Sequence, residues 1–213
     1  TGNGTAGATI AHGLGATPYL VIVKRLTNTY DWAVQNPYTH ATDSQEYILR
    51  LNTNNSSTQD DAFNNTLATS TVVTLGASTY TNATSADQEY VMYAWAPVKG
   101  YSKFSWYKGN GSANGPVINT GFKPSFILVK RWDSGSVNWI MADYKREGYN
   151  PDNDPLYPDV NVAEGTADNI NIFSNGFKVI NSGDDYNNDG GKYFYAAFGQ
   201  PIVASNGVVA TAR

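Results

Sequence analysis

The chain has 213 residues, a formal net charge of −4 and no cysteine. The negative charge argues against binding to a nucleic-acid backbone, because proteins that bind there gather Lys and Arg on one face, and the longest basic runs here are Lys24-Arg25 and Lys130-Arg131. The lack of cysteine excludes disulfides and thiolate metal sites, and no apolar run approaches the roughly 18 residues of a membrane-spanning helix. We therefore expect no nucleic-acid and no membrane partner.

The composition is typical of short strands joined by polar turns. Tyrosine occurs 15 times and methionine twice, and charged residues make up only 15% of the chain. Aromatic and β-branched residues suit a half-buried pleated surface, while Gly and Asn supply turns with positive φ. Segments with the 3.6-residue period of an amphipathic helix are missing. The sequence therefore predicts an all-β fold.

One short plan occurs twice in the chain. Residues 2–25 read GNGTAGATIAHGLGATPYLVIVKR and residues 109–131 read GNGSANGPVINTGFKPSFILVKR. Self-similarity at a fixed period is the signature of a tandem repeat. We expect two related antiparallel β-sandwich units, residues 1–99 and 100–213. Because Thr1 opens directly onto the repeat motif, we also expect that a further segment precedes it.

In the first unit, turns at residues 2–7 and 13–18 are followed by a strand from Tyr19 to Lys24. The run Leu20-Val21-Ile22-Val23 does not alternate, which predicts a central strand covered on both faces. Residues 52–70 are rich in Asn, Ser and Thr and are expected to form a loop with a weak strand at its end. Further strands are expected at 32–34, 47–51, 72–75 and 90–95.

Residues 97–108 join the two units. Tyr101, Phe104 and Trp106 place large rings in this segment, whereas a flexible linker would be rich in Gly and Ser. We therefore expect a strand here, with the two units packed against each other and Trp106 as an anchor between them.

The second unit repeats the order of the first. The pair Asn175-Gly176 between two apolar runs is a strong hairpin signal. Residues 149–160 form a long loop rich in Pro and Asp, and the tail from Ile202 to Arg213 has no clear period. Strands are expected at 126–130, 139–141, 170–173, 177–180 and 193–198. Trp32 and Trp139 occupy equivalent positions, which favours a role in core packing.

The order of motifs resembles a repeat of virion structural and tail-fibre proteins of bacteriophages, especially marine ones, which are described as SPRY-like or concanavalin-like. The motifs are Gly-Asn-Gly, Gly-Phe-Lys-Pro before a strand ending in Lys-Arg, Ala163-Glu164-Gly165, FSNGFKV at 173–179, YFYAAF at 193–198 and the ending NGVVATAR. The first copy departs from the pattern, with Ala16-Thr17 where the second has Phe122-Lys123. The resemblance implies a concanavalin- or jelly-roll-like sandwich on a virus particle and brings no catalytic residues.

A possible calcium site lies near the end of the second unit. Residues 185–190 read DYNNDG, the opening half of a calcium loop, in which oxygen ligands alternate and a Gly allows the bend. The twelfth position is Ala196 rather than Glu, so Asp184 would have to contribute. The candidate ligands are Asp184, Asp185, Asn187 and Asp189; the alternative is a solvated turn without a cofactor.

A possible glycan site lies in the long loop of the second unit. Binding residues tend to lie on long loops of a rigid scaffold, and a ring can stack on a sugar face while a carboxylate accepts hydrogen bonds from its hydroxyls. The candidates are Tyr149, Asp152, Asp154, Tyr157 and Asp159. Alternatively, Pro151, Pro155 and Pro158 only stiffen an exposed loop.

Together these features predict a non-enzymatic fibre or decoration protein of the virion surface, and therefore an extracellular location. Its partners would be other virion proteins, its own copies, with a trimer natural for a fibre, and host surface glycans. One alternative is a secreted bacterial lectin or adhesin. Another is a glycan-degrading enzyme, which would need two carboxylates facing each other across a groove, whereas Asp and Glu here lie mostly in turns.

Overall fold

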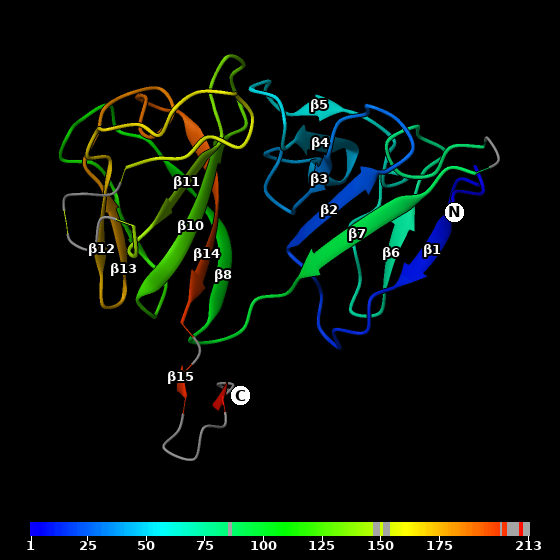
Figure 1. The fold of residues 1–213 in the computed structure, drawn as a ribbon, viewed down its shortest axis with the longest axis horizontal. Helices are drawn as coiled ribbons and strands as arrows, with labels where there is room; N and C mark the ends of the chain where they lie inside the picture. The colour runs from blue at the N-terminus through cyan, green and yellow to red at the C-terminus, as the bar shows by residue number, and fades with distance from the viewer. Residues whose placement is uncertain (85–86, 147–149, 151–153, 201, 204–208, 211–213) are drawn as a thin grey trace. The chain divides into compact units, whose positions relative to one another are not determined.

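The computed structural model describes residues 1–84, 87–146, 150, 154–200, 202–203 and 209–210 (Figure 1). The predicted all-β class is confirmed. The described residues form antiparallel strands and one short 3-10 helix, η1 (Ser44–Glu46), with no α-helix among them. In this part of the chain no helix is long and apolar enough to cross a membrane.

The chain divides into two compact units. Unit 1 contains Thr1–Ala96 together with Trp132–Ser136, and unit 2 contains Pro97–Arg131 together with Val137–Arg213. The expected packing of one unit against the other stays a prediction.

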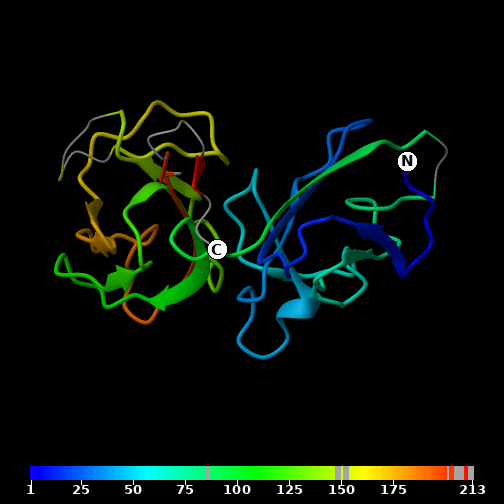
Figure 2. The same ribbon diagram turned by 90° about the horizontal axis from the view of Figure 1, so that it is seen from below.

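Unit 1 has two sheets. The larger has the strand order β5-β4-β3-β2-β7, and the smaller pairs β1 with β6. Their bounds are β1 (Ala8–Ala11), β2 (Leu20–Arg25), β3 (Ala33–Gln35), β4 (Tyr47–Arg50), β5 (Thr58–Gln59), β6 (Val72–Leu75) and β7 (Tyr90–Trp95). Figures 1 and 2 both show β7 beside β2.

The core of unit 1 joins its two sheets. Val21 and Val23 of β2 and Ile48 of β4 belong to the same buried cluster as Val73 and Leu75 of β6. Because both sheets bury side chains in one cluster, the unit is a β-sandwich. The residues from Leu20 to Val23 are all buried, as the non-alternating run predicts.

Unit 2 has the same two-layer plan. A four-stranded sheet has the order β11-β10-β14-β8 and a three-stranded sheet the order β12-β13-β9. Their bounds are β8 (Ser102–Lys108), β9 (Val117–Asn119), β10 (Pro124–Arg131), β11 (Ile140–Asp143), β12 (Ile170–Phe173), β13 (Gly176–Val179) and β14 (Lys192–Gly199). The strands expected from 97–108 and the Asn-Gly hairpin of β12 and β13 are confirmed.

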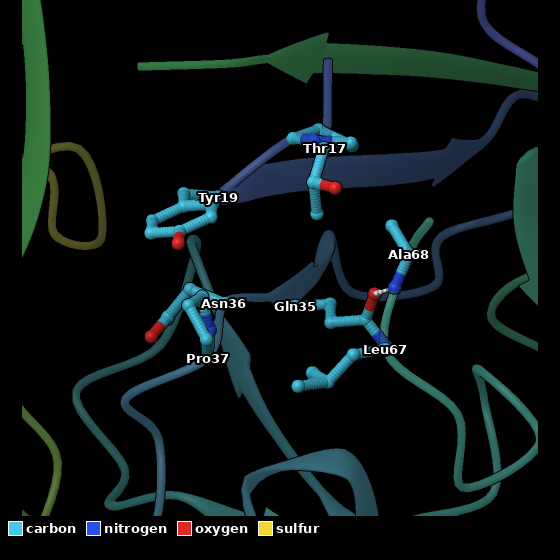
Figure 3. A pocket seen from close by; sticks show the side chains of 8 residues that line it. Thr17, Tyr19, Gln35, Asn36, Pro37, Leu67 and Ala68 are labelled. Atoms are coloured by element: carbon cyan, nitrogen blue, oxygen red, sulfur yellow. Dashed lines mark hydrogen bonds between the residues drawn. The ribbon is translucent and has the colours of Figure 1, made fainter. Parts of the chain in front are cut away.

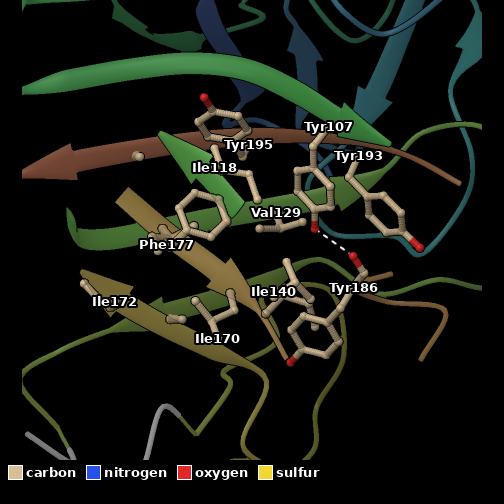
Figure 4. Close-up of a cluster of buried hydrophobic side chains, with 14 of the residues drawn as sticks. Tyr107, Ile118, Val129, Ile140, Ile170, Ile172, Phe177, Tyr186, Tyr193 and Tyr195 are labelled. Atoms are coloured by element: carbon tan, nitrogen blue, oxygen red, sulfur yellow. Dashed lines mark hydrogen bonds between the residues drawn. The ribbon is translucent and has the colours of Figure 1, made fainter. Parts of the chain in front are cut away.

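Aromatic rings fill the core between these two sheets (Figure 4). Tyr107 of β8 stacks on Tyr193 of β14, with ring centroids 4.9 Å apart and planes 7° from parallel. Its hydroxyl donates a hydrogen bond of 2.8 Å to the carbonyl of Tyr186. Phe177 of β13 meets Tyr195 edge-on at 5.5 Å, which connects the two layers.

Strand register shows that the repeat is structural. Val21 of β2 pairs with Gln35 of β3 and Ala94 of β7. The counterpart of Val21 is Ile127 of β10, which pairs with Ala142 of β11 and Ala197 of β14. Residues that match in sequence therefore also match in their strand partners.

Some elements differ from the expectations. The strands β1 and β9 lie between two glycine turns where none was expected, because three- and four-residue strands carry too little periodicity to be recognised. The tail contains two short paired strands, β15 (Ile202–Val203) and β16 (Val209–Ala210). Trp139 is fully buried, as expected of a core residue, whereas Trp32 is only half-buried.

Candidate functional site

A pocket of about 180 Å³ opens in unit 1 where β2 begins and β3 ends (Figure 3). Tyr19, Pro18, Pro37 and Leu67 form apolar walls. Thr17, Gln35 and Asn36 add polar groups. An apolar pocket with a few polar groups is the usual form of a small-molecule site, so this pocket is the candidate functional site.

Local sequence shapes the rim of this pocket. Pro18 stands just before β2, where its missing N–H breaks no strand hydrogen bond. At the end of β3, the side-chain oxygen of Asn36 accepts a hydrogen bond of 2.9 Å from the backbone N–H of Tyr38. This turn, made by an Asn side chain, ends the strand and brings Pro37 to the pocket wall.

Gln35 fixes the opposite wall. Its Nε2 donates to the carbonyl of Thr66 at 2.9 Å, and its Oε1 accepts from the N–H of Ala68 at 3.2 Å, the bond drawn in Figure 3. Gln35 is 3% exposed. Both ends of this buried amide are therefore satisfied, and they hold the segment that carries Leu67.

Asn36 differs from Gln35 in one respect. Its side chain lines the pocket and the residue is only 1% exposed, yet its Nδ2 has no hydrogen-bond partner within the described part of the chain. An unsatisfied buried donor costs about 1–3 kcal/mol. The nitrogen itself is buried, so a ligand oxygen that reaches it after a small shift of the Asn36 side chain would recover that energy.

Unit 2 has a pocket of about 200 Å³ that shares two wall positions with the pocket of unit 1. The sequence repeat places Lys123 where unit 1 has Thr17, and Tyr144 where unit 1 has Pro37. The Lys123 ammonium lies 4.7 Å from the centre of the Tyr144 ring. The two pockets therefore share a position in the fold but differ in chemistry, and neither is lined by Asp or Glu.

Asp143 is the unit 2 counterpart of Asn36. Its Oδ1 accepts from the backbone N–H of Lys145 at 2.8 Å, and its Oδ2 pairs with Nε of Arg146 at 2.6 Å. Burial raises the pKa of the Asp143 carboxyl, but the hydrogen bonds from Arg146 and the backbone outweigh it, so its pKa lies below the ordinary value. Both oxygens are occupied, so this position offers a ligand no free group.

The predicted calcium ligands Asp184, Asp185 and Asn187 accept hydrogen bonds from other residues, and calcium binding at this loop stays a prediction. Asp185 accepts from the backbone N–H of Asn138 at 2.7 Å, and Asp184 accepts from Nδ2 of Asn188 at 2.5 Å. Asn187 is fully buried and its side-chain oxygen accepts from the backbone N–H of Asn110, while Asp189 is exposed. Within the described ranges, no three Asp, Glu or His side chains are grouped so that they could hold a metal ion.

The structure describes three of the five predicted glycan residues, Asp154, Tyr157 and Asp159. Tyr149 and Asp152 lie outside the described residues. Asp154 uses its main-chain oxygen to accept from Arg146 at 2.7 Å. Tyr157 is half-buried, and both carboxylate oxygens of Asp159 are buried. Tyr157 and Asp159 therefore do not form an exposed platform, and glycan contact at this loop stays a prediction.

Asp159 and Asp185 instead lie near a buried lysine. Burial lowers the pKa of Lys130 to about 8, although the charges of Asp159 and Asp185 oppose this shift. Burial also raises the pKa values of both carboxyls. Groups with pKa values shifted in this way can mark a reactive site or a structural ion-pair network. The counterpart of Lys130 in the first repeat distinguishes these two roles.

That counterpart is Lys24. Its ammonium donates to the carbonyls of Arg25 at 2.6 Å and Tyr30 at 2.9 Å. Lys130 donates in the same way to the carbonyl of Val137, which is the counterpart of Tyr30. Each lysine therefore ties down the loop after its own strand, and this structural role accounts for Lys130.

No sequence motif marks Thr17, Tyr19 or Asn36 as site residues. The available signal was Asn36-Pro37 at the end of an apolar strand, since Asn before Pro favours a turn. Only the structure shows that this turn lies beside Pro18 and Tyr19, which precede it by 18 residues or so in the chain.

A family model described as "Domain of unknown function (DUF7483)" matches residues 1–201. No curated protein and no solved structure matches the chain.

Proposed function

The chain belongs to the family described as Domain of unknown function (DUF7483), and we propose that it is a non-enzymatic binding module of a virus-particle surface that holds one sugar residue of a host glycan in the pocket of unit 1. The observation that carries the binding function is Nδ2 of Asn36, which has no partner among the described residues, in a pocket with apolar walls.

The chemistry of the walls favours a sugar. The apolar C–H face of a sugar ring packs on an aromatic ring such as that of Tyr19, while its hydroxyl oxygens accept hydrogen bonds. Asn36 Nδ2 supplies a donor, and the Thr17 hydroxyl can donate or accept. The pocket is smaller than the roughly 300–1,000 Å³ of sites for drug-sized ligands, so we expect a single ring to enter it.

The polar groups of this pocket favour a neutral sugar and a non-enzymatic role. None of the described residues that line the pocket is charged, so an anionic ligand would gain no ion pair from them. Glycoside hydrolysis needs two carboxylates on either side of the scissile bond, and this pocket has neither. Binding without turnover is therefore what these residues support.

The placement on a virus particle rests on the sequence motifs. Both copies of the Gly-Asn-Gly motif and the aromatic strands resemble virion structural and tail-fibre repeats. Other virion proteins and further copies of the chain are the partners that this resemblance implies. A module with few charges and many Tyr, Asn and Ser residues suits adhesion without ionic steering, as in antibody paratopes.

The experiment is a calorimetric titration of the full chain with a panel of neutral monosaccharides and short oligosaccharides. Asn36→Asp keeps the oxygen that accepts from Tyr38 and replaces the donor with a charged carboxylate oxygen, the group that Asp143 has in unit 2. We expect it to weaken binding about tenfold or more, since a hydrogen bond of about 1.4 kcal/mol corresponds to that factor. Tyr19→Ser installs the residue of unit 2 and should abolish binding.

The matched control is Asn65→Asp, which makes the same one-atom change at an exposed position of unit 1 outside the pocket. It should leave the affinity unchanged. If no neutral sugar binds the wild-type chain, the proposed function is wrong. If a sugar binds equally well to the wild type and to Asn36→Asp, the ligand sits elsewhere and the site assignment is wrong.

A further inference from the structure

The strand β7 has an unpaired side. It is the last strand in the order β5-β4-β3-β2-β7, and among the described residues no strand pairs with its other edge. Its counterpart in unit 2 is β14, which has β10 on one side and β8 on the other. Within the described residues, unit 1 therefore has no strand at the position that β8 fills in unit 2.

Side chains of β7 are less buried than their counterparts in β14, as expected if no strand covers the edge of β7. In β14, Tyr193, Tyr195 and Ala197 are 0%, 2% and 0% exposed. Their β7 counterparts Tyr90, Met92 and Ala94 pack against the core of unit 1 but are only partly buried. Among the described residues, no strand therefore covers the apolar side chains at the β7 edge as β8 covers those of β14.

The backbone of β7 is also open on this side. Leu26 donates to the carbonyl of Glu89, and the register pairs Lys24 with Val91 and Ile22 with Tyr93. In an antiparallel ladder the hydrogen-bonded pairs alternate, so the N–H and C=O groups of Met92 and Ala94 point away from β2. The equivalent groups of β14 face β8, with Tyr195 opposite Ser105 and Ala197 opposite Lys103.

Gly2, next to the N-terminal residue, is already hydrogen-bonded beside this edge, at the position that matches Gly109 in unit 2. Gly2 donates to the carbonyl of Gln88 at 2.8 Å, just as Gly109 donates to the carbonyl of Gly191 at 2.8 Å. Gly109 directly follows Lys108, the last residue of β8. Thr1 therefore stands where Lys108 stands in unit 2, and a strand arriving at Thr1 would run antiparallel along β7.

We infer that the free edge of β7 is an acceptor for one more β-strand, which arrives at Gly2 from the N-terminal side along the same polypeptide. Its chemistry is that of β8. It is extended, contains no proline, and carries an aromatic side chain two residues before Gly2. In unit 2 that position is Tyr107, which stacks on Tyr193, and the counterpart of Tyr193 is the partly buried Tyr90.

This inference is independent of the sugar pocket, because it concerns how the units of a repeat are completed. Main-chain hydrogen bonds to an open edge give affinity, and the alternating side chains give specificity, as in other cases of strand addition. An open edge also risks aggregation, which a covering strand removes.

The first test uses the unmodified chain and hydrogen–deuterium exchange resolved to single amides. The amides of Met92 and Ala94 should exchange at least tenfold faster than those of Tyr195 and Ala197, which are bonded to β8. Equal protection of the two pairs would mean that the β7 edge is already covered, and the inference would be overturned.

The second test extends the full chain with the sequence of residues 102–107, SKFSWY, placed directly before Thr1. We expect the amides of Met92 and Ala94 to become protected at least tenfold and the Tm of unit 1 to rise by several degrees. A control extension with serine in place of the final tyrosine should give less than half of the rise in Tm.

The source of the strand is tested by adding the same six-residue peptide in trans to the unmodified chain. Protection by the tethered strand at concentrations where the free peptide is ineffective supports a strand continuous with Gly2. Protection by the free peptide alone would assign the edge to a separate partner. An extension that folds without protecting Met92 and Ala94 would refute the acceptor role.

Discussion

Asn187 and Asn110 hold each other through reciprocal hydrogen bonds. The Oδ1 of Asn187 accepts from the backbone N–H of Asn110 at 2.8 Å, and its Nδ2 donates to the Oδ1 of Asn110 at 2.8 Å and to the carbonyl of Ser112 at 2.7 Å. Asn82 makes the same contacts to Asn3, at 2.7 and 3.0 Å. This Asn–Asn clasp explains why Gly-Asn-Gly occurs in both copies, since it closes each sandwich over its glycine turn.

Replacing Asn187 with Asp should destabilise unit 2. The change removes both bonds donated by Nδ2 and places a carboxylate oxygen against two acceptor oxygens in a fully buried position. We expect the free energy of unfolding to fall by about 2–4 kcal/mol. Urea denaturation followed by tryptophan fluorescence measures this loss.

One variant serves as a control for that experiment, and a second tests the equivalent contact in unit 1. Asp189→Asn makes the reverse one-atom change at an exposed position two residues away and should alter stability by less than about 0.5 kcal/mol. Asn82→Asp breaks the equivalent clasp and should cost unit 1 a similar amount to the loss in unit 2. An Asn187→Asp variant as stable as the wild type would refute the structural role of the clasp.

Gly109 should tolerate no side chain. A Cβ at this residue would overlap the carbonyl oxygen of Asn188, which is backbone and cannot swing aside. We expect Gly109→Ala to lower the free energy of unfolding by about 2 kcal/mol or more. At Gly135 an added Cβ meets no atom nearer than 3.8 Å, so Gly135→Ala should be neutral or slightly stabilising. Equal Tm values for the two variants would contradict this close approach.

Lys130 should make stability depend on pH in the mildly alkaline range. Burial lowers its pKa from 10.5 to about 8 in the folded state, so between these values the unfolded chain binds more protons than the folded one. The contribution of Lys130 to stability is therefore lowest below about pH 8, where the ammonium is charged in both states. It rises with pH above that value. We expect a gain of about 1 kcal/mol between about pH 8 and 9, measured by urea denaturation.

Lys130→Met is the test variant for this gain, because it removes the titrating ammonium and keeps an unbranched apolar stem. Its stability should show no rise over the same pH interval. A rise of the same size in the variant would assign the effect to another group.

At higher pH, the ionisation of Tyr107 should lower the stability, opposite to the effect of Lys130. Burial, and then the neighbouring Tyr193 and Tyr186, raise the pKa of its hydroxyl well above 10.0. The folded state therefore keeps this proton after the unfolded state has lost it, so stability falls as the pH rises above about 10. In Tyr107→Phe this fall should be smaller, whereas stability at neutral pH should drop by about 1 kcal/mol because the bond to the Tyr186 carbonyl is lost.

Sequence patterns predicted much of the fold but little of the candidate site. The apolar runs predicted β2, β10 and β14, because burial on both faces leaves a non-alternating run that is visible in the sequence. The Asn/Asp-rich stretch at 185–190 was interpreted as half of a calcium loop. The same side-chain oxygens can bind a metal ion or accept hydrogen bonds from the backbone. Only the position of Asn110, 77 residues away, shows which partner Asn187 has.

By itself, the sequence determined the all-β class, the duplication and the strands that carry the cores, because these depend on composition and on periods of a few residues. The tertiary structure decided which polar groups are satisfied. It pairs Asn187 with Asn110 and ties Lys130 to Val137. Among the residues that the structure describes, it leaves Nδ2 of Asn36 without a partner and the outer edge of β7 without a strand. These outcomes depend on contacts between segments distant in sequence, and no local pattern records them.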